Sequence, residues 1–458
     1  MPAEDALSAT PLAQPQLREC PGCGLLQSVP ALGPGTRAQC ARCRITLYSV
    51  TTHPLGHSIA LNLASLVLMA VMCATTLMSV QTAGITLHAG LFSGPEELMR
   101  RGMAMLAIVV IFVTVLAPTG KLLGTLYVLI RLHERSPPRH ARRVFALAEK
   151  LRPWSMIEVF ILGVFVAYVK LGDLVHISLE TGVFALMALT ITIIWTDAAL
   201  DREMIWERLG YHDPSRTPSR PDPAPVDPTG ADLTGAYLTR ADLAGASLAG
   251  AVGCETCHLV SLPRGEHAHC PRCGSALHRR KPNSVSRTWA LIIAATVLYI
   301  PANYYPVLTV MQLGAGAPST ILGGVEELLD AHMYPLAALV FFASIAVPVL
   351  KLVGLAVMLV TVQTGRAGWL RDRTKLYFIV HWIGRWSMVD IFMESLLGAL
   401  VRFGAAITIE PGMGAVAFCG VVILTMFAAE TFDPRLMWDA AAARYSSQAR
   451  RNESVVAG

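Results

Sequence analysis

Long apolar blocks separated by polar segments dominate the 458 residues of the chain. A bilayer core of roughly 30 Å needs about 20 apolar residues in a helix, and several blocks reach that length. The pattern predicts four spans in each half; the third and seventh are short, and an extension of the third towards 179 is the alternative. Because the first block follows a polar segment, we expect a retained anchor and no signal peptide. The predicted spans cover residues 58–80, 103–130, 156–169, 182–200, 288–313, 334–362, 388–403 and 413–429.

Composition and charge agree with a membrane protein. Hydrophobic residues make up 53% of the chain and charged residues 15%, with a mean hydropathy of +0.50, whereas soluble domains carry about a quarter charged residues. A net charge of only +5 gives no support to nucleic-acid binding. Basic residues crowd the segments between spans two and three and between spans six and seven, whereas 312–333 contains no Lys or Arg. The positive-inside rule therefore predicts that both termini and both cysteine clusters are cytoplasmic.

The two halves resemble each other at a spacing of roughly 230 residues, which indicates an internal duplication. Pro118 and Lys121 recur as Pro348 and Lys351, and the segment from Trp154 to Glu158 recurs from Trp386 to Asp390. An even number of spans in each half makes the repeats parallel in topology. Parallel and inverted repeats both occur among transporters, so topology does not decide whether the chain is a carrier.

Cysteine spacing predicts two metal sites. Eight of the ten cysteines form Cys-x-x-Cys pairs, and two pairs at short separation are typical of a zinc ribbon. Gly24 and Gly274 each follow a pair and suit its tight turn. Four thiolates in a reducing cytoplasm favour structural Zn²⁺ over disulfides; thiol exchange is the alternative. The expected ligands are Cys20, Cys23, Cys40 and Cys43 in the first ribbon and Cys254, Cys257, Cys270 and Cys273 in the second.

Charged residues also occur inside the predicted spans. Lys121 and Lys351 each follow a proline by three residues, and Glu158 and Asp390 lie early in spans three and seven. A charge within a span costs about 2.5–3.5 kcal/mol on translocon-derived scales. We therefore expect Lys121 to pair with Glu158 and Lys351 with Asp390; the alternative is that the carboxylates lie at the interface and the lysines snorkel. A scaffold role in both halves is the first interpretation, and the candidate scaffold residues are Lys121, Glu158, Trp154 and Trp386.

The second half has features that the first lacks. The segment Pro301-Ala302-Asn303-Tyr304-Tyr305-Pro306 suggests a helix broken by two prolines, with a simple kink as the alternative. Broken helices in membranes line cavities or are buried in protein. Glu394 adds a charge one turn after Asp390. A single substrate route would therefore lie in the second half.

The rest of the chain completes the predicted organisation. Residues 217–228 form a linker rich in Pro and Asp, and 230–250 resemble pentapeptide repeats, for which a β-helical coil and a small-residue spacer both remain open. The chain has no Walker loop, no His-Glu-x-x-His and no nucleophile elbow, so no enzymatic activity is predicted.

The fold class is an α-helical polytopic membrane protein with two tandem modules, each a zinc ribbon plus about four transmembrane helices. The predicted parts are a first ribbon with a flexible start (1–57), a first helical module (58–210), the linker (211–250), a second ribbon (251–283), a second helical module (284–440) and a flexible tail (441–458).

In combination, these features resemble the paraquat-inducible protein A family of bacterial inner-membrane lipid-transport components. The resemblance covers nearly the whole chain, although the first half lacks the Pro-Ala-Asn motif. It implies that the protein exchanges phospholipid with a periplasmic partner whose MCE domains form a tunnel between the two membranes. The motifs that carry it are the paired ribbons, Pro301-Ala302-Asn303, Ser319-Thr320-Ile321, Val347-Pro348 with Lys351, Trp386 to Phe392, and Phe432-Asp433-Pro434-Arg435-Leu436.

A lipid pocket needs an apolar wall for the tails and a few polar groups for the headgroup, and Lys351 suits a phosphate. Two other functions stay open. A membrane thiol oxidoreductase predicts a cysteine pair that cycles between thiol and disulfide, without stoichiometric zinc. A zinc-dependent scaffold or sensor predicts that substitutions in the pocket have no effect on cells. With the resemblance, the candidate lipid-pocket residues are Asn303, Tyr304, Tyr305, Lys351, Asp390 and Glu394.

Overall fold

The computed structural model is mainly helical, and its contacts divide the chain into two compact units. Seven helices in the described ranges are long and apolar enough to cross a membrane. Unit 1 comprises Met1–Leu63, Gly120–Leu151 and Trp195–Arg280, and unit 2 comprises Ala64–Thr119, Arg152–Ile194 and Lys281–Gly458. The repeats 230–249 lie outside the described residues, which are 16–30, 32–50, 55–82, 85–132, 138–172, 176–210, 250–263, 268–312, 315–400 and 407–456.

Unit 1 contains both ribbons. Three short antiparallel strand pairs, β1–β2, β3–β4 and β8–β9, carry three of the four cysteine turns, and a single bridge from His269 to Ala276 flanks the fourth. Two short helices, α5 (Arg139–Leu151) and α8 (Arg202–Leu209), pack with the cysteines of the second ribbon in one apolar cluster that includes Phe145 and Trp206. The predicted combination of four-cysteine ribbons with membrane helices is confirmed. The strands are β1 (Gln16–Glu19), β2 (Leu26–Val29), β3 (Arg37–Gln39), β4 (Thr46–Ser49), β8 (Val252–Gly253) and β9 (Val260–Ser261).

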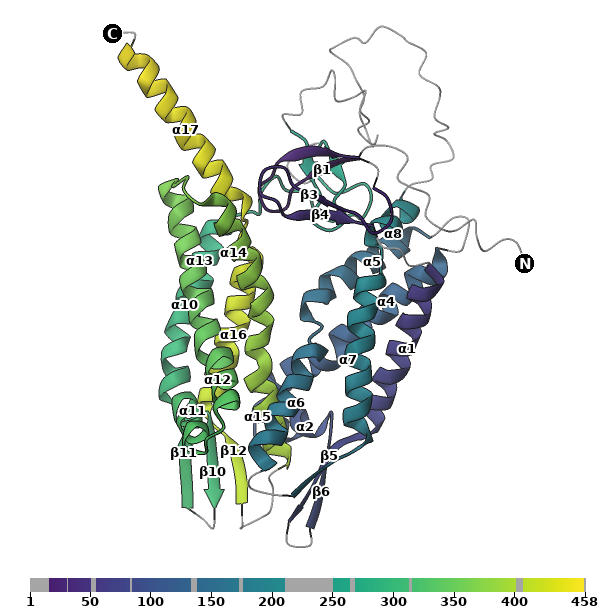
Figure 1. Cartoon of the computed structure of the whole chain (residues 1–458), viewed down its shortest axis with the longest axis vertical. Coiled ribbons are helices and arrows are strands. Elements are labelled where there is room, and N and C mark those ends of the chain that lie inside the picture. The colour runs from purple at the N-terminus through teal and green to yellow at the C-terminus, as the bar shows by residue number, and fades with distance from the viewer. Residues whose placement is uncertain are drawn as a thin grey trace, which may run out of the picture. The chain divides into compact units, whose positions relative to one another are not determined.

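Most of the apolar helical segments belong to unit 2. The helices α10, α13 and α16 pack together in this unit, and Figure 1 shows them side by side. The boundary between the units falls within three continuous helices, α1, α4 and α7. The helical elements are α1 (Leu55–Ala74), α3 (Ala104–Ile111), η2 (Phe112–Leu116), α4 (Ala117–Arg131), η3 (Arg152–Trp154), α6 (Ile157–Gly172), α7 (Thr181–Ala199), α10 (Ser284–Tyr304), α12 (Tyr334–Phe341), η4 (Phe342–Ala346), α13 (Val347–Thr364), α14 (Leu370–Ile383), η5 (Gly384–Met388), α15 (Val389–Leu400), α16 (Met413–Thr431) and α17 (Arg435–Val456).

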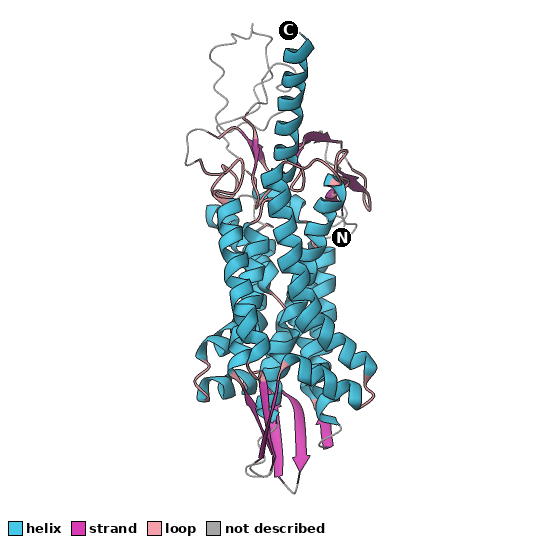
Figure 2. Ribbon diagram, turned by 90° about the vertical axis from the view of Figure 1, so that its left-hand side faces the viewer, coloured by secondary structure: helices cyan, strands magenta, loops and turns pink. Residues whose placement is uncertain are grey.

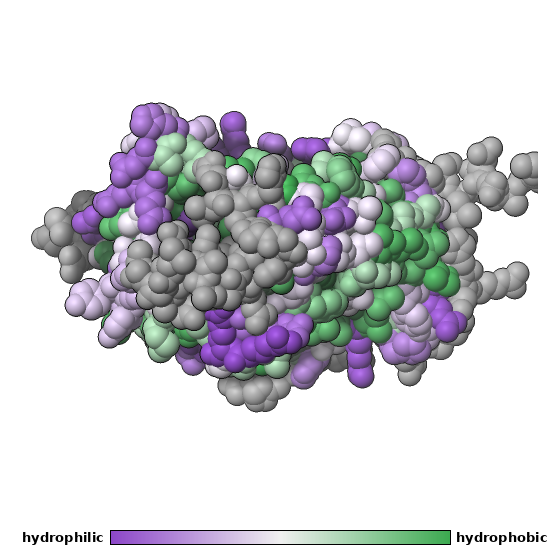
Figure 3. Space-filling model, turned by 90° about the horizontal axis from the view of Figure 1, so that it is seen from below, coloured by the Kyte–Doolittle hydropathy of each residue, from purple (hydrophilic) through white to green (hydrophobic). Residues whose placement is uncertain are grey.

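Two antiparallel sheets of three strands lie at one end of the unit 2 helices (Figure 2). Each repeat supplies one sheet, in the orders β6-β5-β7 and β11-β10-β12, together with a short helix, α2 (Ser93–Arg100) or α11 (Ile321–Asp330). Seen from this end, hydrophilic residues lie among hydrophobic ones, so the end is not uniformly apolar (Figure 3). The strands are β5 (Thr76–Thr82), β6 (Ile85–Gly90), β7 (His176–Leu179), β10 (Leu308–Gln312), β11 (Ala315–Ser319) and β12 (Ile407–Pro411).

These strands correct the predicted ends of spans one and five. The first span ends at Ala74 and the fifth at Tyr304, because the apolar residues that follow each helix belong to the central strands β5 and β10. The suggested break in the fifth span is also wrong, since α10 continues through Pro301 and simply ends before Pro306. The seventh predicted span corresponds to α15, of which the structure describes 12 residues, up to Leu400.

A π-helical turn occurs at the same place in both repeats. The turn η2 precedes Pro118, and η4 precedes Pro348. The proline ring would clash with the carbonyl four residues earlier in a regular α-helix, and a wider π turn relieves that crowding. In both turns the residue four positions before the proline carries a hydroxyl. Thr114 donates to Val110 O at 2.6 Å, and Ser344 donates to Val340 O at 2.7 Å. Such turns are frequent at functional sites.

Equivalent positions of the two repeats contact each other inside unit 2. Helices α6 and α15 pack side by side, and the rings of Phe160 and Phe392 meet edge to face at 5.4 Å. These two phenylalanines follow Glu158 and Asp390 by the same two residues. The approach is close because Gly163 has no side chain: a Cβ there would lie 2.7 Å from the Cβ of Phe392. The two repeats therefore meet at equivalent positions of α6 and α15.

Candidate functional site

Four cysteine turns of one design build the two clusters. In each turn the first cysteine accepts a hydrogen bond from the residue four positions later, as Gly24 N donates to Cys20 O at 2.9 Å. That later residue has positive φ in all four turns, which the sequence predicted for the two glycines. In the other two turns this residue is Arg44 or His258, and its backbone has a strain that glycine would avoid.

The geometry of both clusters fits a metal ion. Each set of four buried sulfur atoms lies within 4.8 Å. Close pairs, such as Cys20 with Cys43 at 3.4 Å and Cys257 with Cys270 at 3.5 Å, approach the edge of roughly 3.8 Å that a ZnS₄ tetrahedron requires. All ten cysteines are free thiols, and Cys73 and Cys419 lie apart in membrane helices. The chemistry of these donors is that of a closed structural site with no open position.

The two ribbons contact each other through Glu19. Its carboxylate accepts a hydrogen bond from Gly253 N at 2.6 Å and pairs with Arg280 at 3.2 Å. Glu19 and Gly253 are the residues just before the first cysteine of each ribbon. A Cβ on Gly253 would lie 2.8 Å from the Cβ of Glu19, so glycine permits the contact. Equivalent positions thus meet in unit 1 as they do in unit 2.

A buried ion pair joins the first ribbon to α8. Arg18 donates to both carboxylate oxygens of Glu203 at 2.7 and 2.8 Å, and the two side chains are 6% and 11% exposed. The guanidinium also lies 4.9 Å from the ring centroid of Tyr48. Burial raises the pKa of Glu203, but the hydrogen bonds and charge of Arg18 outweigh it and hold the pKa below its usual value. The folded state therefore favours an ionised Glu203.

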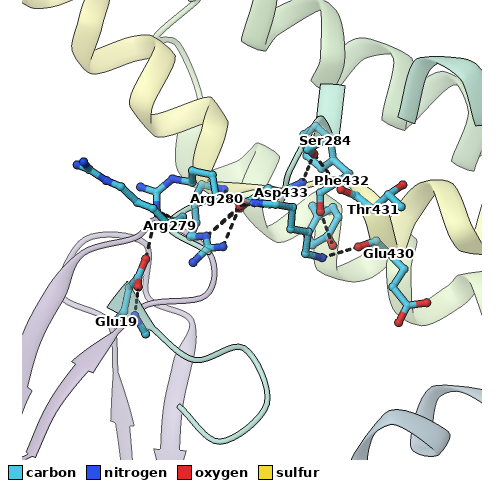
Figure 4. Close-up of polar contacts among 12 residues, drawn as sticks. Glu19, Arg279, Arg280, Ser284, Glu430, Thr431, Phe432 and Asp433 are labelled. Atoms are coloured by element: carbon cyan, nitrogen blue, oxygen red, sulfur yellow. Dashed lines mark hydrogen bonds and ion pairs between the residues drawn. The ribbon is translucent and has the colours of Figure 1, made fainter. Parts of the chain in front are cut away.

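The boundary between the units falls between Arg280 and Lys281. On the unit 1 side Arg280 pairs with Glu19, and on the unit 2 side Lys281 donates to Glu430 O (Figure 4). Asp433 accepts from Lys281 N at 3.2 Å and from the guanidinium of Arg435 at 2.9 Å. Burial raises the pKa of Asp433, but the hydrogen bonds and charge of Arg435, together with the backbone N–H of Lys281, hold it below its usual value. The Phe-Asp-Pro-Arg motif is thus an anchor for the chain that leaves the second ribbon.

A polar pocket lies inside unit 2, among α6, α11, η4 and α15. Its volume is about 40 Å³, which accommodates water but not a lipid. Asp390 is 6% exposed and Glu394 is 2% exposed, and among the described residues neither carboxylate forms an ion pair; the Asp390 carboxylate lies near the Ser344 hydroxyl. Lys170 and Ser344 also line the pocket, and apolar residues such as Phe418 line the rest of it.

The structure places the predicted charged residues differently from the expected pairs. Lys121 donates to Asp197 at 2.7 Å, and Glu158 pairs with Arg385 at 3.2 Å, so the predicted Lys121–Glu158 pair is wrong. The hydropathy of a span does not show which face of its helix meets a neighbouring helix. The partner of each charged residue therefore could not be predicted from the span pattern. The Lys351–Asp390 pair is also wrong.

Lys351 is 2% exposed and donates to Gly384 O at 2.7 Å and to Thr425 Oγ1 at 3.3 Å. It satisfies its ammonium with a carbonyl and a hydroxyl and does not line the polar pocket. Gly384 permits this approach, since a Cβ there would lie 2.5 Å from Lys351 Cε. Of the six candidate pocket residues, the structure therefore brings Asp390 and Glu394 together and leaves Lys351 elsewhere.

The remaining predicted residues lie outside the polar pocket. Asn303 donates to Tyr299 O at 2.8 Å within its own helix, and Tyr304 is 78% exposed beside Tyr305. Trp154 packs between Phe112 and Phe427, whereas Trp386 contacts Trp382. The scaffold role of the two tryptophans stays a prediction.

Lys170 and Ser344 line the pocket, and sequence reasoning gave neither of them a role. Lys170 lies in the last turn of α6, where the predicted span was already ending, so its charge received no weight. Ser344 precedes Pro348 by four residues, as Thr114 precedes Pro118. A hydroxyl residue four positions before a proline within an apolar block was the available signal.

Comparisons with known proteins come from families and from individual relatives. The family described as Paraquat-inducible protein A matches residues 55–210 and again 285–442, and pentapeptide repeats match 229–254. The Escherichia coli K12 protein named "Intermembrane transport protein PqiA" is 32% identical over 92% of this chain and 95% of its own length. "Lipophilic envelope-spanning tunnel protein A" of the same organism is 30% identical over 92% and 91%. "Probable intermembrane transport protein" of Haemophilus influenzae is 26% identical over 94% and 97%. No solved structure matches the chain.

Proposed function

We propose that this chain, which belongs to the paraquat-inducible protein A family, is the inner-membrane component of a lipid-transport system. It exchanges phospholipid with a periplasmic partner whose MCE domains form a tunnel. Both termini and both ribbons lie in the cytoplasm, as the basic segments favour, and each ribbon holds one Zn²⁺. Relatives named as intermembrane transport proteins support the transport role, and none of these names describes an enzyme.

One observation carries the proposal: two carboxyl groups, neither of them in an ion pair among the described residues, are buried within the membrane helices of unit 2. An unpaired charge in such a place is costly and marks a functional site. Asp390 and Glu394 lie one turn apart on α15, and both face the pocket that Lys170 shares. A scaffold alone would be more stable with apolar residues at these positions.

The pocket is too small for a lipid in this conformation, and its walls indicate how it widens. Ser344 belongs to the π turn η4, and Ser319, Thr320 and Gly324 come from the end of β11 and the start of α11. A π turn interrupts the regular hydrogen-bond ladder of the helix. Movement at η4 widens the pocket and admits a lipid headgroup to the charged residues, while the apolar walls accept the tails.

The thiol oxidoreductase receives less support than a structural metal. Each cluster holds four sulfur atoms together, whereas a redox pair needs only two. A closed shell of four thiolates braces the fold and leaves no position for a substrate.

The experiment compares Asp390→Asn, Glu394→Gln and Lys170→Ala with Glu326→Gln, an exposed carboxylate on the neighbouring helix α11. Each variant is expressed in cells whose outer-membrane barrier depends on this chain, and phospholipid that co-purifies with the chain is counted by mass spectrometry. The three pocket variants should reach the membrane in normal amount, lose the barrier and carry less phospholipid, while Glu326→Gln behaves as wild type. Full activity of all three pocket variants would overturn the proposal.

A further inference from the structure

A second cavity lies in unit 1, between α5 and the second ribbon. Its volume is about 540 Å³, within the range of sites for small molecules. The residues that line it are His140, Arg142 and Arg143 from α5 and the turn from Cys270 to Gly274, which includes Arg272. Three guanidinium groups and an imidazole thus face one cavity whose described lining contains no carboxylate.

Two of these arginines are held in place by the fold. Arg142 donates through Nε to Leu209 O at 2.7 Å, which fixes its guanidinium and leaves both Nη atoms without a hydrogen bond to a described residue. Arg272 is 8% exposed and donates to Cys257 O at 3.4 Å. Fixed guanidiniums lose little freedom when they bind an anion.

Arg143 completes the set from the solvent side. It is exposed and has no hydrogen bond or ion pair with any described residue. Two residues before and two residues after it, Ala141 and Phe145 are fully buried in the cluster that contains the cysteines of the second ribbon. One face of α5 therefore packs on the second ribbon, while Arg142 and Arg143 beside that face line the cavity.

We infer that this cavity is a binding site for a phosphate-bearing anion. Guanidinium forks match the geometry of phosphate oxygens, and several of them around one cavity favour a group with two charges or several acceptors. The helix α5 begins a few residues after the membrane helix α4, in a segment rich in arginine. Phosphate is available there both from anionic lipid headgroups and from solution. The site lies apart in sequence from the polar pocket and does not depend on the proposed lipid transport.

The test uses the full chain, purified in a neutral detergent and freed of lipid, with two probes: dihexanoylphosphatidylglycerol and inorganic phosphate. Titration calorimetry measures the affinity for wild type, Arg142→Gln, Arg143→Gln and Arg272→Gln. The matched control for Arg272 is Arg42→Gln, the same position in the first ribbon. Metal content and elution volume establish that each variant is folded, and the exposed Arg143 keeps the test valid if Arg272→Gln fails to fold.

We expect one site per chain, and a loss of affinity of about tenfold or more in the cavity variants but not in Arg42→Gln. Binding of the lipid analogue alone identifies a headgroup as the source, and displacement of it by inorganic phosphate identifies the phosphate in solution. The inference is overturned if neither probe binds at one site, or if Arg42→Gln weakens binding as much as Arg143→Gln. The latter result would mean that the arginines only balance the charge of the thiolates.

Discussion

Removing one partner of the Arg18–Glu203 pair should loosen the junction between the first ribbon and α8. Arg18→Met leaves the carboxylate of Glu203 buried and uncompensated, because its side chain is 11% exposed and both oxygens lose a donor. Breaking a buried pair in this way costs about 3–5 kcal/mol. Because about 1.4 kcal/mol corresponds to a factor of ten, local opening should become roughly a hundredfold to several thousandfold more frequent.

Hydrogen–deuterium exchange of the purified chain measures this opening directly, since backbone amides report local free energies of unfolding. Peptides that cover β1, β2 and α8 should exchange faster in Arg18→Met, while peptides of α16 in unit 2 keep the wild-type rate. The double variant Arg18→Met/Glu203→Leu removes both charges and should return within about tenfold of wild type, because an apolar replacement is often close to neutral.

An exposed pair provides the control. Glu96 and Arg100 are bonded at 2.5 Å on α2 with side chains 61% and 59% exposed, and pairs of this kind contribute roughly 0–1 kcal/mol. Arg100→Met should change the exchange of α2 by less than about fivefold. The reasoning is refuted if Arg18→Met accelerates exchange by less than tenfold, or if the double variant is as loose as the single one.

Three further outcomes follow from the geometry. Because the pKa of Glu203 is depressed in the folded state, its contribution is complete above its unfolded pKa, about 4.3, and is lost as pH falls through the folded pKa; acid should lower the melting temperature of wild type more steeply than that of Glu203→Gln. Gly163→Ala places a Cβ 2.7 Å from that of Phe392 and should cost about 1–3 kcal/mol, seen as a lower melting temperature; Gly172→Ala, at an open position of the same helix, should cause no fall. Cys257→Ser should remove one of two metal ions per chain in elemental analysis, whereas Cys73→Ser should remove none, and equal loss in both would contradict the ribbon assignment.

Much of the fold could be predicted because its strongest signals are local. A bilayer fixes the length of an apolar helix, and a tetrahedral metal site fixes the spacing of cysteine pairs. Local composition was insufficient where helix and strand have the same apolar content, as in Thr76–Thr82 and Leu308–Gln312, which pair into sheets. The strands there depend on partners distant in sequence, such as β12 for β10.

The polar contacts were predicted less well, since each depends on which helix faces meet. Lys121 was assigned the carboxylate of the next span and in fact bonds Asp197, near the end of the fourth span. Asp390 and Glu394 were placed in one site because they are one turn apart on a single helix, which sequence does reveal. Lys170 comes from the other repeat, and only the packing of α6 on α15 brings it to them.

The contacts between equivalent positions have an evolutionary consequence. Phe160 meets Phe392, and Glu19 meets Gly253, which are the self-contacts that a twofold homodimer of one repeat would make. In such a dimer both partners must be the same residue, so a glutamate could not face a glycine. Fusion of two copies into one gene removes that restriction. It allows one copy to specialise as a brace, with Lys121 bonded to Asp197, while the other acquires Glu394 and an unsatisfied polar centre.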